Sequence, residues 1–387
     1  MVQDPEIKIE GSLIRHFSNL VKTKGGINLA QGIPGFKPPE DLLKILSSTG
    51  KNDVHQYAPG SGNTSLIEFL CKSYRSSSIM ADVIITNGAT EAISLVYNYL
   101  MYIVDKEDFN VAAFSPAYES YIHLPQIFGH KFFPVIIDDD NYFDENTFER
   151  FFVENKIKLL FLASPGNPYG KSITKDKLDF LINLAEKQNS FIILDAVYDE
   201  LYFKDARVEF FDKAISENVF YVNSFSKKFS ITGWRIGYFL MHNKHYSKMC
   251  YVHDYIGLSA PAPLQYAIAE YVRGGNYNEY IEDLRRKVKT NYLYAIEKLT
   301  KSGFYCPNAD GGYFVWCRLP VGFNDSLKFG LDIYEKTRTA VIPGIHFGQE
   351  WYKYIRINVA RPFEEFSAGI DNIIEFVSQR RKFDEYI

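Results

Sequence analysis

Short apolar runs alternate with longer amphipathic stretches through the middle of the chain. Two runs, Leu159–Ala163 and Phe191–Leu194, contain only apolar residues, which is typical of strands buried on both faces. Between them, Lys175–Gln188 has the apolar spacing of a helix, as does Glu91–Met101 further upstream. Further strands are predicted at Val83–Thr86, Val111–Phe114, Phe132–Ile137, Val219–Val222 and Ile236–Leu240. This alternation predicts an α/β domain with a largely parallel sheet.

The pattern changes before Asp41 and after about Arg273. Long helices are predicted at Tyr280–Lys301 and Phe363–Lys382, and short strands at Tyr313–Arg318, Thr339–Ile342 and Tyr354–Val359. We therefore expect a smaller α+β domain at 274–387, a large domain at 41–273, and an N-terminal segment, 1–40, that joins the small domain.

Composition narrows the classes of protein that the chain can represent. The formal net charge is −4, so the chain lacks the excess of basic residues that is typical of nucleic-acid-binding proteins. No apolar run approaches the roughly 20 residues that span a membrane, and the polar N-terminus lacks a signal-peptide pattern. The four cysteines form no CxxC pair, so we expect neither a disulfide framework nor a metal site. These features predict a cytoplasmic protein.

The segment 224–237, SFSKKFSITGWRIG, concentrates polar and basic side chains directly after an apolar run. A lysine amine can form a Schiff base with an aldehyde cofactor, and hydroxyls together with a guanidinium can bind a phosphate. On residue types alone, a basic surface loop explains the segment equally well.

The whole segment resembles the lysine signature of class I/II aminotransferases, S-x-S-K-x-(aromatic)-x-x-x-G-W-R-(I/V/L)-G. In that family the cofactor lysine lies eight residues before the phosphate-binding arginine, and Lys227, not Lys228, has this spacing to Arg235. The resemblance implies the three-layer fold type I of pyridoxal-phosphate enzymes, with a mostly parallel central sheet. It also implies that Lys227 carries pyridoxal 5'-phosphate and that Ser224, Ser226 and Arg235 lie at its phosphate.

Two further motifs match family positions at the cofactor ring. In LDAVY, Asp195 matches the carboxylate that pairs with the pyridine nitrogen, and Tyr198 matches a partner of the ring's phenolate oxygen. In SPGNPYG, Asn167 matches the second partner of that oxygen, although Gly166 and Tyr169 depart from the commoner Asn and Thr. Taken alone, an acid after a strand is as often a helix cap or an ion-pair partner, and the second motif is also an ordinary Pro/Gly turn.

Weaker matches extend the resemblance toward the N-terminus. In TNGATEA, the residues Gly88, Ala89 and Thr90 match the family's phosphate cradle at a helix N-terminus. Tyr118, two residues after Pro116, matches the aromatic side chain that stacks on the cofactor ring. Strand–helix turns and single tyrosines are common, so each match is weak by itself.

Three residues match positions that act on the substrate or across a subunit boundary. Arg356, within the apolar run Tyr354–Val359, matches the clamp for the substrate α-carboxylate, for which a bidentate guanidinium is well suited. A partly buried salt bridge is the alternative for Arg356. Gly32 matches a position beside the same carboxylate, and Tyr57, in QYAPGSG, matches a tyrosine that reaches the phosphate of a neighbouring subunit. The last match implies a homodimer with shared active sites.

The resemblance implies ping-pong transamination between an L-amino acid and a 2-oxo acid, with Lys227, Asp195 and Tyr198 as the catalytic residues. The segments VHDYIGLS (252–259) and PLQ (263–265) resemble methionine and kynurenine aminotransferases, which favours methionine or an aromatic amino acid as donor. A cysteine-S-conjugate β-lyase on the same scaffold is the main alternative, because the same residues serve elimination at Cβ. A non-catalytic ligand-sensing domain is a second alternative.

Overall fold

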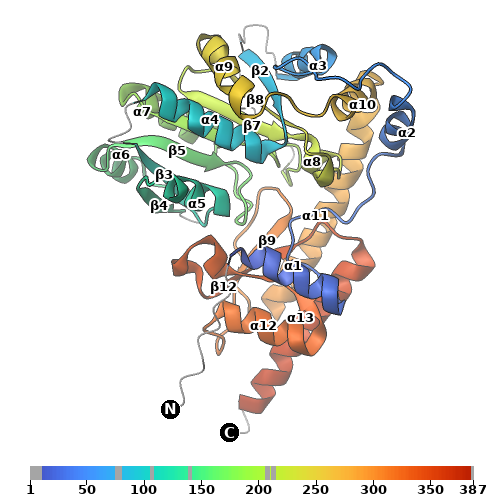
Figure 1. The fold of residues 1–387 in the computed structure, drawn as a ribbon. Helices are drawn as coiled ribbons and strands as arrows, with labels where there is room; N and C mark the ends of the chain where they lie inside the picture. The colour runs from blue at the N-terminus through green and yellow to red at the C-terminus, as the bar shows by residue number, and fades with distance from the viewer. Residues whose placement is uncertain are drawn as a thin grey trace. The chain divides into compact units, whose positions relative to one another are not determined.

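A computed structural model describes residues 11–74, 81–104, 109–137, 142–204, 210 and 215–384. The chain divides into two compact units (Figure 1). Unit 1 comprises Met1–Pro34, Lys287–Asn308 and Tyr313–Ile387, and unit 2 comprises Gly35–Arg286 with Ala309–Gly312. The chain passes from unit 2 back to unit 1 between Arg286 and Lys287, inside helix α11 (Tyr277–Lys301). The sequence predicts this boundary between residues 273 and 274.

Unit 2 contains a seven-stranded sheet. In spatial order its strands are β2 (Ala81–Thr86), β8 (Gly237–His242), β7 (Val219–Ser224), β6 (Phe191–Asp195), β5 (Ile157–Ala163), β3 (Asn110–Ser115) and β4 (Phe132–Ile136). All neighbours pair in parallel except β8, which is antiparallel to both β2 and β7. The predicted mostly parallel α/β sheet is therefore confirmed. Strand β6 is its central strand and β5 lies next to it, in agreement with the continuous apolar runs 159–163 and 191–194 that they contain.

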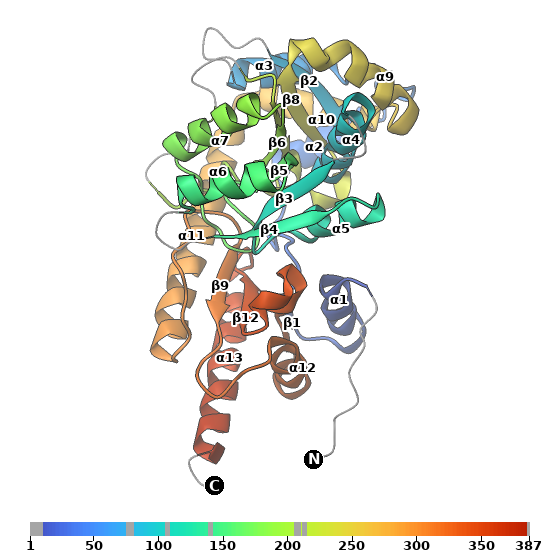
Figure 2. The ribbon, with the colours of Figure 1, turned by 90° about the vertical axis from the view of Figure 1, so that its left-hand side faces the viewer.

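Helices cover both faces of this sheet, as Figure 2 shows. Helices α6 (Glu145–Glu154) and α7 (Lys175–Lys187) lie on one face, and α4 (Ala89–Ile103) and α5 (Glu119–Ile127) lie on the other. Helix α9 (Tyr246–Ile256) packs into the same apolar cluster as α4. Local sequence determines where such helices begin: the Thr174 hydroxyl accepts from the Lys177 N–H and so caps α7. The other helices of this unit are α2 (Glu40–Thr49), α3 (Thr64–Tyr74), α8 (Phe225–Lys228) and α10 (Ala262–Arg273).

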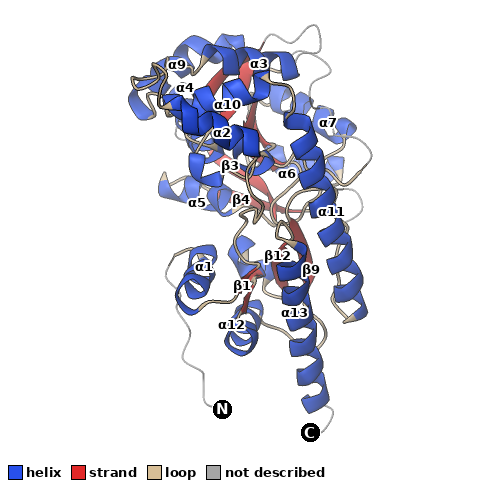
Figure 3. Ribbon diagram, turned by 90° about the vertical axis from the view of Figure 1, so that its right-hand side faces the viewer, coloured by secondary structure: helices blue, strands red, loops and turns tan. Residues whose placement is uncertain are grey.

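Unit 1 is an α+β assembly of small sheets and helices (Figure 3). Its three-stranded antiparallel sheet has the order β11 (Ile342–Pro343), β12 (Tyr354–Asn358) and β9 (Phe314–Arg318). A parallel pair joins β1 (Ile27–Asn28) to β10 (Thr339–Ala340), so the N-terminal segment pairs with the C-terminal part of the chain. The helices are α1 (Leu13–Lys24), α12 (Ser326–Thr337) and α13 (Phe363–Asp384). The single strand predicted at 339–342 is split, because its two halves pair with different partners.

The carboxyl ends of the parallel strands bring the chemically important loops of unit 2 together. Strand β3 leads into Tyr118, β5 into the turn that contains Asn167, and β6 ends on Asp195. Open α/β sheets bind their ligands at this edge. No helix among the described residues is long and apolar enough to cross a membrane.

Candidate active site

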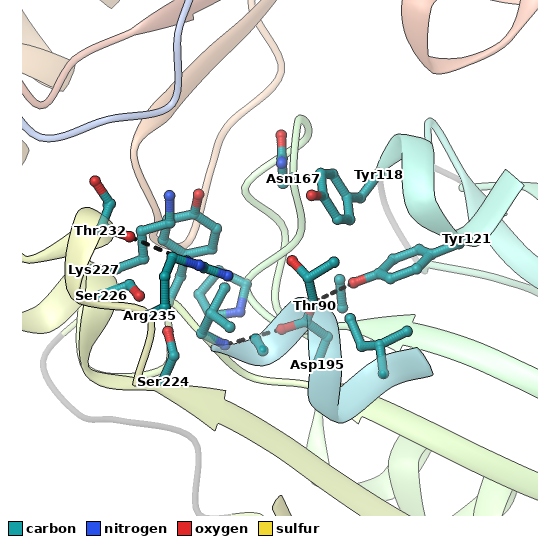
Figure 4. Close-up of a pocket in the computed structure, with 16 residues that line it drawn as sticks. Thr90, Tyr118, Tyr121, Asn167, Asp195, Ser224, Ser226, Lys227, Thr232 and Arg235 are labelled. Atoms are coloured by element: carbon teal, nitrogen blue, oxygen red, sulfur yellow. Dashed lines mark hydrogen bonds between the residues drawn. The ribbon is translucent and has the colours of Figure 1, made fainter. Parts of the chain in front are cut away.

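A cavity of about 180 Å³ opens at this edge of the sheet, entirely within unit 2 (Figure 4). It contains ten of the residues predicted for the site: Ala89, Thr90, Tyr118, Asn167, Asp195, Tyr198, Ser224, Ser226, Lys227 and Arg235. Six further lining residues were not predicted: Ile93, Tyr121, Ala163, Pro165, Val197 and Thr232. Residues from widely separated parts of the chain thus share one cavity.

Asp195 is a buried carboxylate with two hydrogen-bond donors (Figure 4). The Tyr121 hydroxyl donates to its Oδ2 at 2.5 Å, and the Val197 N–H donates to its Oδ1 at 3.2 Å. Burial raises the pKa of Asp195, while these two hydrogen bonds and the positive charge of Lys227 act in the opposite direction. Burying a charged carboxylate destabilises the fold when no cation is near, and a cationic group beside it offsets this cost.

Tyr121 was not predicted as a site residue, although it lines the cavity and hydrogen-bonds Asp195. Its ring stacks on Phe161 with ring centres 4.8 Å apart, and it meets Tyr118 edge-on at 5.5 Å. Burial, together with the negative charge of Asp195, raises the pKa of Tyr121 well above its ordinary value, so its hydroxyl stays a donor. Tyr118 precedes α5 and Tyr121 follows three residues later, a spacing that places both on one helix face. That spacing was the available signal.

The two adjacent lysines have different surroundings. The Lys227 side chain lines the cavity, and its Nζ lies 5.7 Å from the centre of the Tyr198 ring. Lys228 is 5% exposed and forms an ion pair with Glu200, and its Nζ lies 3.4 Å from the Tyr238 hydroxyl. Burial is the largest single influence on the pKa of Lys228 and would lower it, but the interactions with Glu200, Tyr74 and Asp199 together outweigh burial and the net pKa is raised. Lys228 is thus a structural cation outside the cavity that Lys227 lines.

Arg235 and two glycines form the cationic end of the cavity. The Arg235 guanidinium donates to the Thr232 carbonyl at 3.1 Å and to the Asn87 carbonyl at 3.3 Å. A Cβ atom on Gly88 would lie 2.3 Å from Arg235 Nη2, and one on Gly237 would lie 2.5 Å from the Gly88 carbonyl carbon. Glycine at both positions therefore lets the start of β8 and the Arg235 side chain approach the first residues of α4 closely.

The same end of the cavity provides hydroxyl groups and a helix N-terminus. Ala89 and Thr90 begin α4, where backbone N–H groups favour an anion. Ser224 precedes α8, and Ser226 within it has a buried Oγ without a hydrogen-bond partner among the described residues. Together with Arg235, this polar end of the cavity has the composition of a phosphate site.

Asn167 is presented by a compact loop after β5. The Gly170 N–H donates to the Gly166 carbonyl at 2.8 Å, and the Ile173 N–H donates to the Ser164 hydroxyl at 3.1 Å. These bonds close the loop on itself, so Asn167 is positioned by backbone geometry.

Four predicted site residues do not line this cavity. Gly88 lies against the Arg235 guanidinium, which lines the cavity in its place, and Tyr57 is 84% exposed. Gly32 and Arg356 belong to unit 1, where Arg356 is 1% exposed. The Arg356 guanidinium donates to the Ala30 carbonyl at 2.7 Å and lies 4.1 Å from the centre of the Phe314 ring.

Comparisons with known proteins agree with this chemistry. The family model for aminotransferase class I and II matches residues 24–372. The chain belongs to this family. The aspartate aminotransferase of Thermotoga maritima is 27% identical over 365 residues, which cover 92% of each chain. The probable kynurenine–oxoglutarate transaminase of Saccharomyces cerevisiae is 32% identical over 308 residues, which cover 75% of this chain and 68% of the relative. The structure of Escherichia coli YbdL, with a methionine aminotransferase function, superposes with a TM-score of 0.83 at 24% identity, covering 97% of this chain and 100% of that chain.

This aminotransferase uses pyridoxal phosphate. When bound, the cofactor supplies an electron sink for the carbanion that forms at Cα of the amino acid. The cavity residues fit this group, because Lys227 offers an amine, Asp195 a buried carboxyl group, and Ser226 a buried hydroxyl that has no hydrogen-bond partner in the described part of the chain. The expectation of a pyridoxal-phosphate-dependent transaminase is thereby confirmed.

Proposed function

We propose that the aminotransferase takes methionine or an aromatic, kynurenine-like amino acid as donor and a 2-oxo acid as acceptor, by a ping-pong mechanism. The observation that carries this choice is the 252–265 segment, whose sequence is similar to methionine and kynurenine aminotransferases. The relative at 32% identity, named as a kynurenine–oxoglutarate transaminase, supports it. Several other relatives are named aspartate aminotransferases, so the donor must be decided by experiment.

In this proposal Lys227 would hold the cofactor through its side-chain amine. The same amine would serve as the base that takes the proton from Cα of the bound substrate. Asp195, oriented by Tyr121, would stabilise a positive charge on the pyridine nitrogen. Tyr198 and Asn167 line the same cavity as Lys227 and would donate hydrogen bonds to the ring oxygen.

The remaining cavity residues hold the cofactor in place. Ser224, Ser226 and Arg235 bind the phosphate together with the α4 N-terminus, from Gly88 to Thr90. Tyr118 stacks on the ring, and its edge-on contact with Tyr121 fixes its orientation.

We propose that Arg356 binds the α-carboxylate of the substrate, beside the backbone of Gly32. A buried guanidinium that rests on an aromatic ring keeps its charge and a fixed plane, which suits bidentate binding of a carboxylate.

We also propose a homodimer in which Tyr57 reaches the phosphate of the partner subunit. Tyr57 extends into solvent, and the loop that follows it lies against α9, since a Cβ on Gly60 would be 3.1 Å from Asp254 Oδ1. The C-terminal end of α9 also exposes Tyr255 (79%) and Ile256 (51%). Exposed apolar side chains on these two neighbouring segments support an interface here.

The decisive experiment adds a panel of amino acids to the purified holoenzyme and records loss of the cofactor's absorbance band together with 2-oxo acid release. We expect fast conversion with methionine, phenylalanine or kynurenine and slow conversion with aspartate. A preference for aspartate would refute the proposed donor class. Release of pyruvate from a cysteine conjugate, in excess of transamination, would instead favour the β-lyase alternative.

A further inference from the structure

Two cysteines of unit 1 lie opposite each other on antiparallel segments. Tyr305 and Arg318 form an antiparallel bridge, with N–H···O bonds of 3.2 and 2.8 Å in the two directions. Because the segments run in opposite directions, the next pair is Cys306 opposite Cys317. A pair that follows a doubly hydrogen-bonded pair has Cα atoms about 4.5 Å apart, within the roughly 4.4–6.8 Å that a disulfide spans.

The side chains of these two cysteines point to the same face. Tyr305 and Arg318 share the outer face, where the guanidinium lies 5.1 Å from the tyrosine ring centre. Successive residues of a strand alternate between faces, so Cys306 and Cys317 share the inner one. Burial raises the pKa of Cys317 well above its ordinary value, and the interaction with the Cys306 thiol raises it further. Cys317 is buried, whereas Cys306 is partly exposed and open to a reagent.

The segment between the two cysteines enters unit 2. Residues 309–312 pack there by backbone hydrogen bonds: the Asp310 N–H donates to the Gly170 carbonyl, and the Gly312 N–H donates to the Leu201 carbonyl, both at 2.8 Å. Cys306 and Cys317 therefore stand on the two arms of a hairpin whose tip, 309–312, belongs to the other unit.

This hairpin tip packs against the wall of the cofactor cavity. A Cβ on Gly311 would lie 2.9 Å from Pro165 Cγ, and one on Gly312 would lie 3.9 Å from Tyr198 Cγ. Pro165 and Tyr198 both line the cavity. The motion of the tip is therefore coupled by direct contact to two residues of the active site.

We propose that Cys306 and Cys317 are a site of reversible oxidative modification, which a low-molecular-weight disulfide converts to an intramolecular disulfide. The Cys306 thiolate attacks one sulfur of the reagent, which forms a mixed disulfide and releases one thiol. The Cys317 thiol then gives up its proton and its sulfur attacks the Cys306 sulfur, which breaks the mixed bond and releases the second thiol. The two protein thiols are oxidised, the reagent is reduced to two thiols, and those thiols carry away the two protons.

The disulfide ties the two arms together at the base of the hairpin. It removes conformational freedom from the loop that it closes, so the tip and its hydrogen bonds to Gly170 and Leu201 open less often. Oxidation thus stiffens one wall of the cofactor cavity without altering any residue that lines it.

The test equilibrates the holoenzyme in glutathione buffers from fully reduced to fully oxidised, then denatures and alkylates it. We expect the labelled cysteines to fall from all four to two, and a peptide that links Cys306 to Cys317 to appear. Reduction by dithiothreitol restores all four labels. Amide hydrogen exchange at Asp310 and Gly312 is expected to slow in the oxidised protein.

Matched variants separate this pair from the other thiols. Cys306→Ser is expected to keep all its remaining cysteines labelled in the oxidised buffer, whereas Cys71→Ser still forms the 306–317 link. Full labelling of the wild type at the oxidised end, or links that involve Cys71 or Cys250, would overturn the proposed site. Unchanged exchange at 309–312 in the cross-linked protein would overturn its effect on the hairpin.

Discussion

Adjacent lysines in one short helix have separate tasks because their side chains leave α8 in different directions. Lys227 enters the cavity beside Tyr198, while Lys228 is buried against Glu200. One amine lies at the cavity that we propose binds the cofactor, and the other forms a buried ion pair.

Substitution of the two lysines is expected to separate chemistry from stability. Lys227→Ala should abolish the absorbance band of the lysine-bound cofactor, because the attached amine is lost. Lys228→Met should keep the band but lower the free energy of unfolding by about 3 kcal/mol, since Glu200 is left unpaired. Absorbance spectra and urea denaturation of both variants measure these outcomes, and an intact band in Lys227→Ala would refute the assignment.

Asp195 has a stability cost that depends on pH. Its pKa is raised by burial, so in the cofactor-free protein the charged carboxylate is less favourable in the folded state than in the unfolded state. Because its pKa is higher in the folded state, protonation of Asp195 favours folding. This favourable contribution to the free energy of unfolding is complete below the unfolded-state pKa of about 4 and is lost as the pH rises through the folded-state pKa.

Asp195→Asn is therefore expected to stabilise the cofactor-free protein more at pH 7 than at pH 4, while greatly reducing transamination. Thermal unfolding across this pH range measures the difference, with Asp254→Asn, at an exposed position, as the control. A difference from wild type that does not change with pH would contradict the prediction.

At the scale of elements, the sequence predicts which edge of the large sheet carries the site. It predicts the hydrogen-bond partners of the site residues only in part. The continuous apolar runs of β5 and β6 identify central strands, and motif spacing separates Lys227 from Lys228. The spacing from Tyr118 makes Tyr121 a candidate for the cavity, but its hydrogen bond to Asp195 joins residues 74 positions apart, and local spacing does not encode that contact. The opposition of Cys306 and Cys317 was missed for a related reason, since it depends on strand register.

The division of the predicted strand 339–342 has the same origin. Its apolar sequence is suitable for pairing along its whole length, but β10 pairs with β1 and β11 pairs with β12. The competition between partners is decided by tertiary structure, not by propensity.

The close approach of β8 to α4 makes a precise prediction about glycine. Gly88 has φ of 82° and no room for a Cβ beside Arg235, whereas a Cβ on Gly233 would meet nothing within 4 Å. Gly88→Ala should displace the guanidinium and weaken cofactor binding at least tenfold, which corresponds to about 1.4 kcal/mol. Gly233→Ala should leave it near wild type, and equilibrium titration of the apoenzyme with pyridoxal phosphate compares them. Equal affinities would show that this contact is not needed.

On the scale of the whole molecule, the exposed side chains of Tyr57 and of Tyr255 on α9 predict association. Tyr255→Lys would place a charge at a position where the proposed homodimer buries an aromatic ring, so the variant should be largely monomeric and lose activity. Val321→Lys changes a residue that is 94% exposed in unit 1 and should remain a dimer. Sedimentation velocity distinguishes the two variants, and a dimeric Tyr255→Lys protein would refute the proposed interface.

The contact between Arg235 and the turn before α4 also has a consequence for biosynthesis. The hydrogen bond from Arg235 to the Asn87 carbonyl joins residues 148 positions apart. The ribosome makes α4 well before Arg235 and β8. The polar end of the cavity, formed by Arg235 and the start of α4, is therefore incomplete until β8 has been made and inserted between β2 and β7. Long-range closure of this kind is slow, so cofactor capture should come late in folding, after most of the large sheet has formed. Binding of pyridoxal phosphate would then stabilise a sheet that has already formed and would not direct its folding.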